Sequence, residues 1–136
     1  MPIKSTINPG ERLVFTRSWG VLTFEETMTH YDVLVADPEF NPDYDQLAIH
    51  SEVLSFAGTA EQWSHLGRRK LFSNTSFRAH VSDRDSVYGL LRLIATHHEL
   101  EHKHERARIF RDEDSARRWL SQMRAERDTK TEHAPE

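Results

Sequence analysis

Hydrophobic and polar positions along this chain repeat with two periods, and the switches between them predict its secondary-structure elements. Between Phe77 and Phe110, a short strand is followed by a helix with apolar residues at steps of three and four, and then by a second strand. A strand, a helix and a strand within about thirty-odd residues are typical of a right-handed parallel crossover. This stretch therefore predicts an α/β fold.

The N-terminal part predicts a β-hairpin. Strand-like patterns at 3–7 and 13–19 flank a turn in which Pro9 and Gly10 take positions that a type II turn favours. The second strand has apolar residues on both faces, which indicates a strand covered on both sides. We expect Gly20 to end it.

Helix-capping residues predict where the helices begin. Thr23 with Glu26, and Thr59 with Gln62, each fit a capping box, in which two side chains satisfy two otherwise unpaired backbone N–H groups. Asp112 is a natural N-cap for a last helix. The remaining strands are expected at 46–50, 77–81 and 107–110.

The resulting order, β-β-α-β-α-β-α-β-α, predicts one α/β domain over residues 1–127. Its sheet should be mostly parallel, with an N-terminal antiparallel β-hairpin. The 136 residues suffice for one hydrophobic core. Residues 128–136 have nothing to bury and are expected to be disordered.

Composition and charge narrow the function classes. The chain contains no cysteine, which excludes disulfides and thiolate metal sites. No apolar run reaches the roughly 18–20 residues of a membrane-spanning helix, and the N-terminus lacks the apolar core of a secretion signal, so we expect a cytoplasmic protein. The second half carries fifteen basic side chains, but twelve acidic ones lie among them, so we do not expect nucleic-acid binding.

Several short segments accompany this order of elements. They are Arg12-Leu13-Val14, Trp19-Gly20-Val21-Leu22-Thr23 with Glu25-Glu26, Tyr31, Leu34, Asp37-Pro38-Glu39-Phe40, Asp45-Gln46-Leu47, Val53, and Phe110-Arg111-Asp112 with Ala116 and Trp119-Leu120. Over roughly residues 3–123 the chain thus resembles the STAS-like domains of anti-sigma-factor antagonists and sulfate-transporter tails, and especially stand-alone bacterial members. The resemblance implies a STAS-like fold and a small binding or regulatory module, with another protein or a small ligand as its partner.

Signalling members of that family carry a phosphorylated Ser or Thr just before a Gly at the start of the second helix. The corresponding residue here is Ala57, before Gly58, and it has no hydroxyl group. Partner switching by phosphorylation is therefore not expected. Ser55 and Thr59 flank this position and remain candidates for binding.

A second set of candidates follows the predicted parallel strands. Ligands of open α/β sheets bind at the carboxyl ends of the strands, so the residues there could hold a small anion or touch a partner. The same residues are also good turn and cap residues, and both interpretations stay open. The set comprises His50, Ser51 and Glu52, then Ser82, Asp83 and Arg84, and finally Arg111 and Asp112.

His98-Glu99-Leu100-Glu101-His102 matches the H-E-x-x-H pattern, in which two histidines one helical turn apart share a zinc ion. Glu101 places a charge where that pattern normally has none, no Gly-containing third-ligand motif follows, and nine histidines make a chance match easy. We therefore expect no stoichiometric metal at His98 and His102 or elsewhere in the 97–104 cluster, and no cofactor. We expect a solvated helix end instead, where His near the C-terminus suits the helix dipole.

The sequence thus predicts a non-enzymatic binding module that acts on another protein. A small-ligand, lipid or membrane-surface binder, using apolar residues near Phe56 and Trp63, is the second hypothesis, and a zinc hydrolase is a distant third. No P-loop, G-x-G-x-x-G or G-x-S-x-G motif is present. A pocket lined by apolar side chains would favour the second hypothesis, and a contiguous exposed apolar patch would favour the first. The oligomeric state is not indicated.

Overall fold

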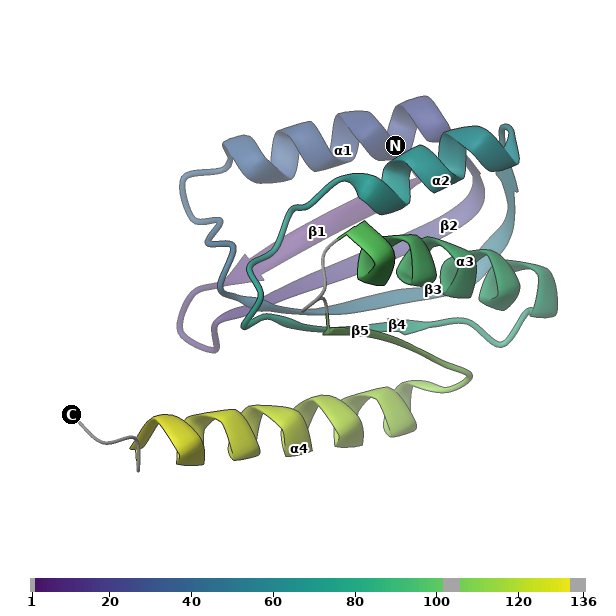
Figure 1. The fold of residues 1–136 in the computed structure, drawn as a ribbon. Helices are drawn as coiled ribbons and strands as arrows, with labels where there is room; N and C mark the ends of the chain where they lie inside the picture. The colour runs from purple at the N-terminus through teal and green to yellow at the C-terminus, as the bar shows by residue number, and fades with distance from the viewer. Residues whose placement is uncertain (1, 102–105, 133–136) are drawn as a thin grey trace.

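The computed structural model describes residues 2–101 and 106–132, and in these ranges five strands and four helices follow one another in the predicted order (Figure 1). The elements are β1 Ile3–Asn8, β2 Leu13–Thr23, α1 Phe24–Ala36, β3 Asp45–Ala57, α2 Ala60–Arg68, β4 Phe77–Val81, α3 Asp85–Glu101, β5 Arg106–Phe110 and α4 Glu113–Glu132. Within the same ranges, no helix is both long and apolar enough to span a membrane.

The five strands form one sheet in the order β1-β2-β3-β4-β5. β1 and β2 pair antiparallel, and each later strand pairs parallel with the strand before it. Because successive crossovers move in one direction with one hand, α1, α2 and α3 all lie on the same face, and α4 covers the other face (Figure 1). The predicted α/β fold, with a mostly parallel sheet and an N-terminal antiparallel hairpin, is confirmed.

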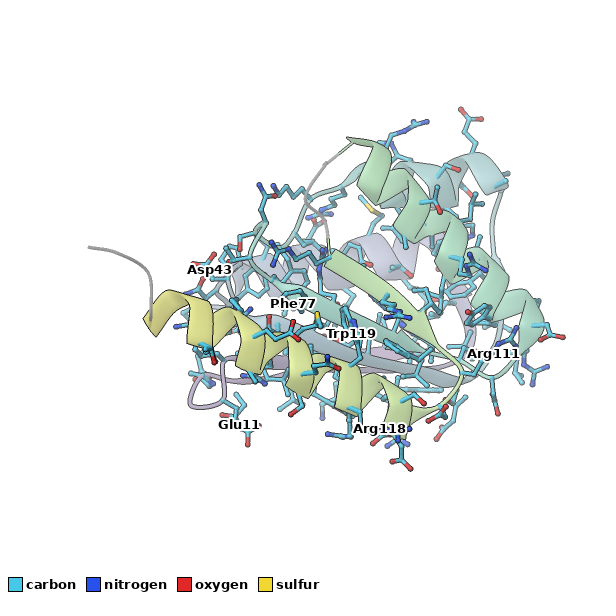
Figure 2. The ribbon with its side chains drawn as sticks, turned by 60° about the horizontal axis from the view of Figure 1, so that its bottom comes forward. Glu11, Asp43, Phe77, Arg111, Arg118 and Trp119 are labelled. Atoms are coloured by element: carbon cyan, nitrogen blue, oxygen red, sulfur yellow. The ribbon has the colours of Figure 1, made fainter. Side chains whose placement is uncertain are left out.

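The face beneath α4 has a purely apolar centre. Leu47 on β3 and Ala79 on β4 pack against Leu120 of α4. Figure 2 shows Phe77 and Trp119 between the helix and the sheet, where their rings meet edge to face at 5.8 Å. This contact holds α4 over strands β3, β4 and β5.

Trp63 of α2 is the largest fully buried side chain on the opposite face, with 2% of its surface exposed. Its ring packs edge-on against Phe56 at 4.7 Å and against Phe24 at 6.1 Å. Leu22 and Val53 complete this core beside it. Trp63 therefore joins α1 and α2 to the far ends of β2 and β3.

β2 and β3 are longer than the sequence predicted. Gly20 does not end β2: it adopts a left-handed φ of 68°, and register shifts around it mark bulges that bend the strand. β2 thus continues to Thr23, paired with a β3 that continues to Ala57. The two strand ends curve toward α1 and α2 (Figure 1).

α4 runs to Glu132, past the boundary expected at residue 127. A buried carboxylate fixes its last turns, because Arg124 and Arg127 both contact Asp45 at the start of β3. The segment expected to be disordered thus begins as helix. Residues 133–136 lie outside the described residues.

Candidate functional site

The two faces of the sheet differ in chemistry. Alternate residues of a strand point to opposite faces. On β3 and β4 the residues beneath α4 are apolar except for Asp45 at the start of β3, while those beneath α1, α2 and α3 are mostly polar. The polar residues lie on three adjacent strands at the centre of the sheet. They are Thr16 and Ser18 on β2, Gln46 and His50 on β3, and Arg78 and His80 on β4.

A pocket of about 80 Å³ lies between this polar sheet face and the helices. Its floor includes Gln46, Arg78 and His80, and its walls are apolar side chains such as Leu91 and Ile94 of α3. A single water needs roughly 10–15 Å³ by the same measure, so the pocket has room for a small molecule. An apolar pocket with a few convergent polar groups is the usual form of a ligand site.

One part of the floor is a neutral hydrogen-bond network. Thr16 Oγ1 accepts from Gln46 Nε2 at 2.9 Å and lies 2.7 Å from Ser5 Oγ. Ser5 Oγ in turn lies 2.8 Å from His30 Nε2 on α1. Burial lowers the pKa of His30, which keeps its ring neutral in this network.

A second network runs through two histidines. His50 Nδ1 bonds to Ser18 Oγ, and His50 Nε2 lies 3.1 Å from His80 Nδ1. The two imidazole rings are stacked, 7° from parallel. Desolvation lowers the pKa of His50 to about 4, so the ring carries no charge at neutral pH. One of its nitrogens then donates a hydrogen bond in this network and the other accepts one.

Arg78 places a positive charge at the floor of the pocket. Its side chain is 5% exposed, and its guanidinium lies 5.5 Å from the centre of the Phe72 ring. Desolvation lowers the pKa of Arg78 to about 10, against the opposing effects of Tyr31 and Asp45. The group therefore stays protonated at neutral pH, in an environment of low polarity.

His50 is the only one of the six predicted binding residues that lines this pocket, and it does so from within β3 rather than from a loop. Ser51 and Ser55 are exposed residues of the same strand. Thr59 is the N-cap of α2, and its capping box with Gln62 is confirmed. The sequence pattern therefore located a helix start at Thr59.

The residues predicted at the carboxyl ends of β4 and β5 make turn and cap contacts. Ser82 is fully buried, and its hydroxyl accepts from the backbone N–H of the exposed Arg84. Arg111, labelled in Figure 2, pairs with Asp85 at the first turn of α3. Asp112 accepts from Ser115 N at 2.8 Å, as the predicted N-cap of α4 should.

The predicted metal residues cannot be placed. The side chains of His98 and His102, with the rest of the 97–104 cluster, lie outside the described residues. In the part of the chain that the structure describes, no three His, Cys, Asp or Glu side chains come together as metal ligands would.

Sequence reasoning missed the polar floor although a pattern for it exists. Gln46 and His50 are four residues apart on β3, and Arg78 and His80 are two apart on β4, so each pair shares one face of its strand. Polar residues at even spacings on two adjacent inner strands predict one polar face between helix and sheet.

No protein-family model matches the chain, and no curated protein sequence matches it either. The class of protein is therefore defined by its own geometry: an α/β domain whose five-stranded sheet carries a mainly apolar core on one face and, on the other, a mainly apolar pocket with a polar floor.

Proposed function

We propose that this protein is a non-enzymatic binding module of the STAS-like type that holds a small organic ligand between its sheet and α1, α2 and α3. The observation that carries the proposal is the contrast between the two sheet faces. The order of strands and helices supports its STAS-like part.

Burying polar groups is costly unless they are hydrogen-bonded, and even then they stabilise a fold less than apolar packing does. Beneath α4, by contrast, the packed side chains are apolar apart from Asp45, whose carboxylate is paired with Arg124 and Arg127. Polar side chains are concentrated instead on the face that also contains the cavity. Ligand recognition explains both features together.

The surroundings of Ala57 favour ligand binding over a phosphorylation switch. Gly58 has a φ of 129° and joins β3 to α2, while the hydroxyl of Thr59 caps the helix. The hydroxyl-free Ala57 and the capping role of Thr59 leave the pocket as the better candidate for a functional site.

Phe56 and Trp63 also support this proposal, but their role in it differs from the one that the membrane-surface hypothesis gives them. Trp63 is buried in the core and cannot insert into a lipid surface. Both aromatic rings line the pocket. Their apolar surfaces can therefore contact a ligand bound inside the domain.

The test is a titration of the ¹³C-methyl spectrum with three four-carbon probes, butyrate, 1-butanol and butylamine. At least one probe is expected to give saturable shifts confined to methyl groups of Leu91, Ile94 and Ile109. Ala48 lines the pocket from β3, and Ala48→Ile, which fills the space, should abolish these shifts. Ala57→Ile, at the exposed end of the same strand, should preserve them. Shifts from no probe, or equal shifts in Ala48→Ile, would exclude the pocket as a ligand site.

Protein–protein binding is the second candidate, favoured by three exposed apolar residues on the bent ends of β2 and β3. Trp19, Val21 and Leu54 are 39%, 50% and 56% exposed. Exposed apolar residues on neighbouring strands are typical of contact surfaces. A partner bound there would be lost in Trp19→Ser and retained in Ala48→Ile, which separates the two candidates.

A further inference from the structure

The sheet has two edge strands, β1 and β5, and within the described residues neither pairs with a strand on its outer side. β5 carries Arg106 and Arg108 at exposed positions, and charged side chains of this kind oppose pairing with another chain. β1 is six residues long and carries one charge, on Lys4. β1 is therefore the edge better suited to accept a further strand.

The hydrogen bonds to β2 determine which backbone groups of β1 point outward. Trp19 N donates to Pro2 O at 2.9 Å, so these two residues form a hydrogen-bonded pair of the antiparallel ladder. Every second residue of such a ladder forms a pair of this type, and the residues between direct their backbone N–H and C=O groups away from the partner strand. On β1 the outward-directed residues are Ile3, Ser5 and Ile7.

These three residues make β1 complementary to a copy of itself. In a two-fold antiparallel pairing centred on Ser5, Ser5 faces its own copy and Ile3 faces Ile7 of the second copy. Each of these pairs joins outward-directed residues and can exchange two backbone hydrogen bonds. Lys4 faces Thr6 of the second copy, whereas a pairing centred on Lys4 would bring two like charges together. The sequence of the strand thus selects one register.

Helix α1 has an exposed apolar side chain above the same edge. His30 Nε2 on α1 lies 2.8 Å from Ser5 Oγ, and Val33, three residues further on, shares that flank of the helix. Val33 is 59% exposed. α1 lies over β1 and β2 (Figure 1), and paired strands are about 4.8 Å apart, so α1 of a two-fold copy would lie about 10 Å away. Helices pack at this separation, and Val33 would then be covered.

We propose that the protein forms a two-fold symmetric dimer in which the β1 strands of two copies pair antiparallel, centred on Ser5, and join the two sheets into one. The α1 helices of the two copies pack side by side across the axis. The dimer goes beyond the proposed ligand-binding function and does not depend on it. A second copy is the occupant that fits this edge, because one register pairs isoleucine with isoleucine and keeps the lysines apart.

The test is sedimentation equilibrium of the full chain, with far-UV circular dichroism to confirm folding. Wild-type protein is expected to form a dimer, and Thr6→Lys, at an exposed position, should raise its dissociation constant about tenfold by placing like charges opposite each other on both sides of the axis. The double variant Lys4→Glu/Thr6→Lys should restore the dimer. Thr6→Glu alone should strengthen it, since its carboxylate would face Lys4, and a folding defect cannot produce that gain.

Ser55→Lys is the matched control, because it adds the same charge at an exposed position of β3, two strands from the edge, and should leave the dimer unchanged. A protein that stays monomeric up to about 1 mM would overturn the proposal. A dimer that Thr6→Lys does not weaken, or that the double variant does not restore, would also overturn it. A dimer that is lost in Trp19→Ser and kept in Thr6→Lys would place the interface on the bent ends of β2 and β3 instead.

Discussion

Replacing Asp45 with alanine is expected to lower the free energy of unfolding by about 3–5 kcal/mol, the usual effect of removing one partner from a buried ion pair. Asp45 is 1% exposed. Its Oδ1 accepts from Phe77 N and from Arg127 Nη1, both at 2.8 Å, and its Oδ2 accepts from Arg127 Nη2 at 2.9 Å. Arg124 Nε lies 3.0 Å from the same Oδ2. Alanine would leave two guanidinium groups and one backbone N–H without this acceptor.

Urea denaturation followed by far-UV circular dichroism measures this effect. Glu113→Ala is the control, because Glu113 makes an exposed pair with Arg117 one turn along α4. That pair should contribute less than about 1 kcal/mol. An Asp45→Ala protein within 1 kcal/mol of wild type would mean that the carboxylate does not anchor α4.

The stability of the protein is expected to fall with acidification between pH 6.5 and about 4, because His50 titrates differently in the folded and unfolded chain. Burial lowers the pKa of His50 to about 4, against an ordinary value of 6.5. Between these values the unfolded chain binds a proton that the folded chain does not, so acid favours unfolding. Stability from this source is complete above pH 6.5 and is lost as the pH falls to 4. The full difference amounts to about 3 kcal/mol.

The groups around His50 are Ser18 on β2 and His80 on β4, and His30 on α1 also has a lowered pKa that acts in the same direction. The measurement is therefore a difference between proteins. The free energy of unfolding of His50→Gln should depend less on pH in this window by about 3 kcal/mol. His65→Gln, at an exposed position of α2, should follow the wild-type curve. Parallel curves for wild type and His50→Gln would contradict the expectation.

The sequence was sufficient to predict the order of elements because periodicity and capping are local properties. The capping boxes at Thr23 and Thr59 are both present in the structure. The length of β2 and β3 was not predictable in the same way. A glycine such as Gly20 usually interrupts a strand. Here β2 continues through a bulge because it pairs with β3.

The site was predicted less well, for a related reason. Caps and turns use the same residue types as ligand sites, and Ser82 and Thr59 proved to have local partners. No function was predicted for Arg78, because a single arginine within a strand matches no local sequence motif. Its position became informative only when the sheet register placed it beside Gln46, beneath three helices. Long-range pairing of this kind is not encoded in any short stretch.

The consecutive strand order has a consequence for synthesis of the chain. Each parallel strand pairs with the one before it, so the sheet can grow in step with the ribosome, and α1, α2 and α3 cover one side as they emerge. The other side waits for α4, which follows all five strands. Until then Leu47, Ile49 and Phe77 face water, and a nascent chain at that stage is open to self-association and to chaperones. This exposure ends when α4 packs on the sheet and Arg124 and Arg127 bind Asp45.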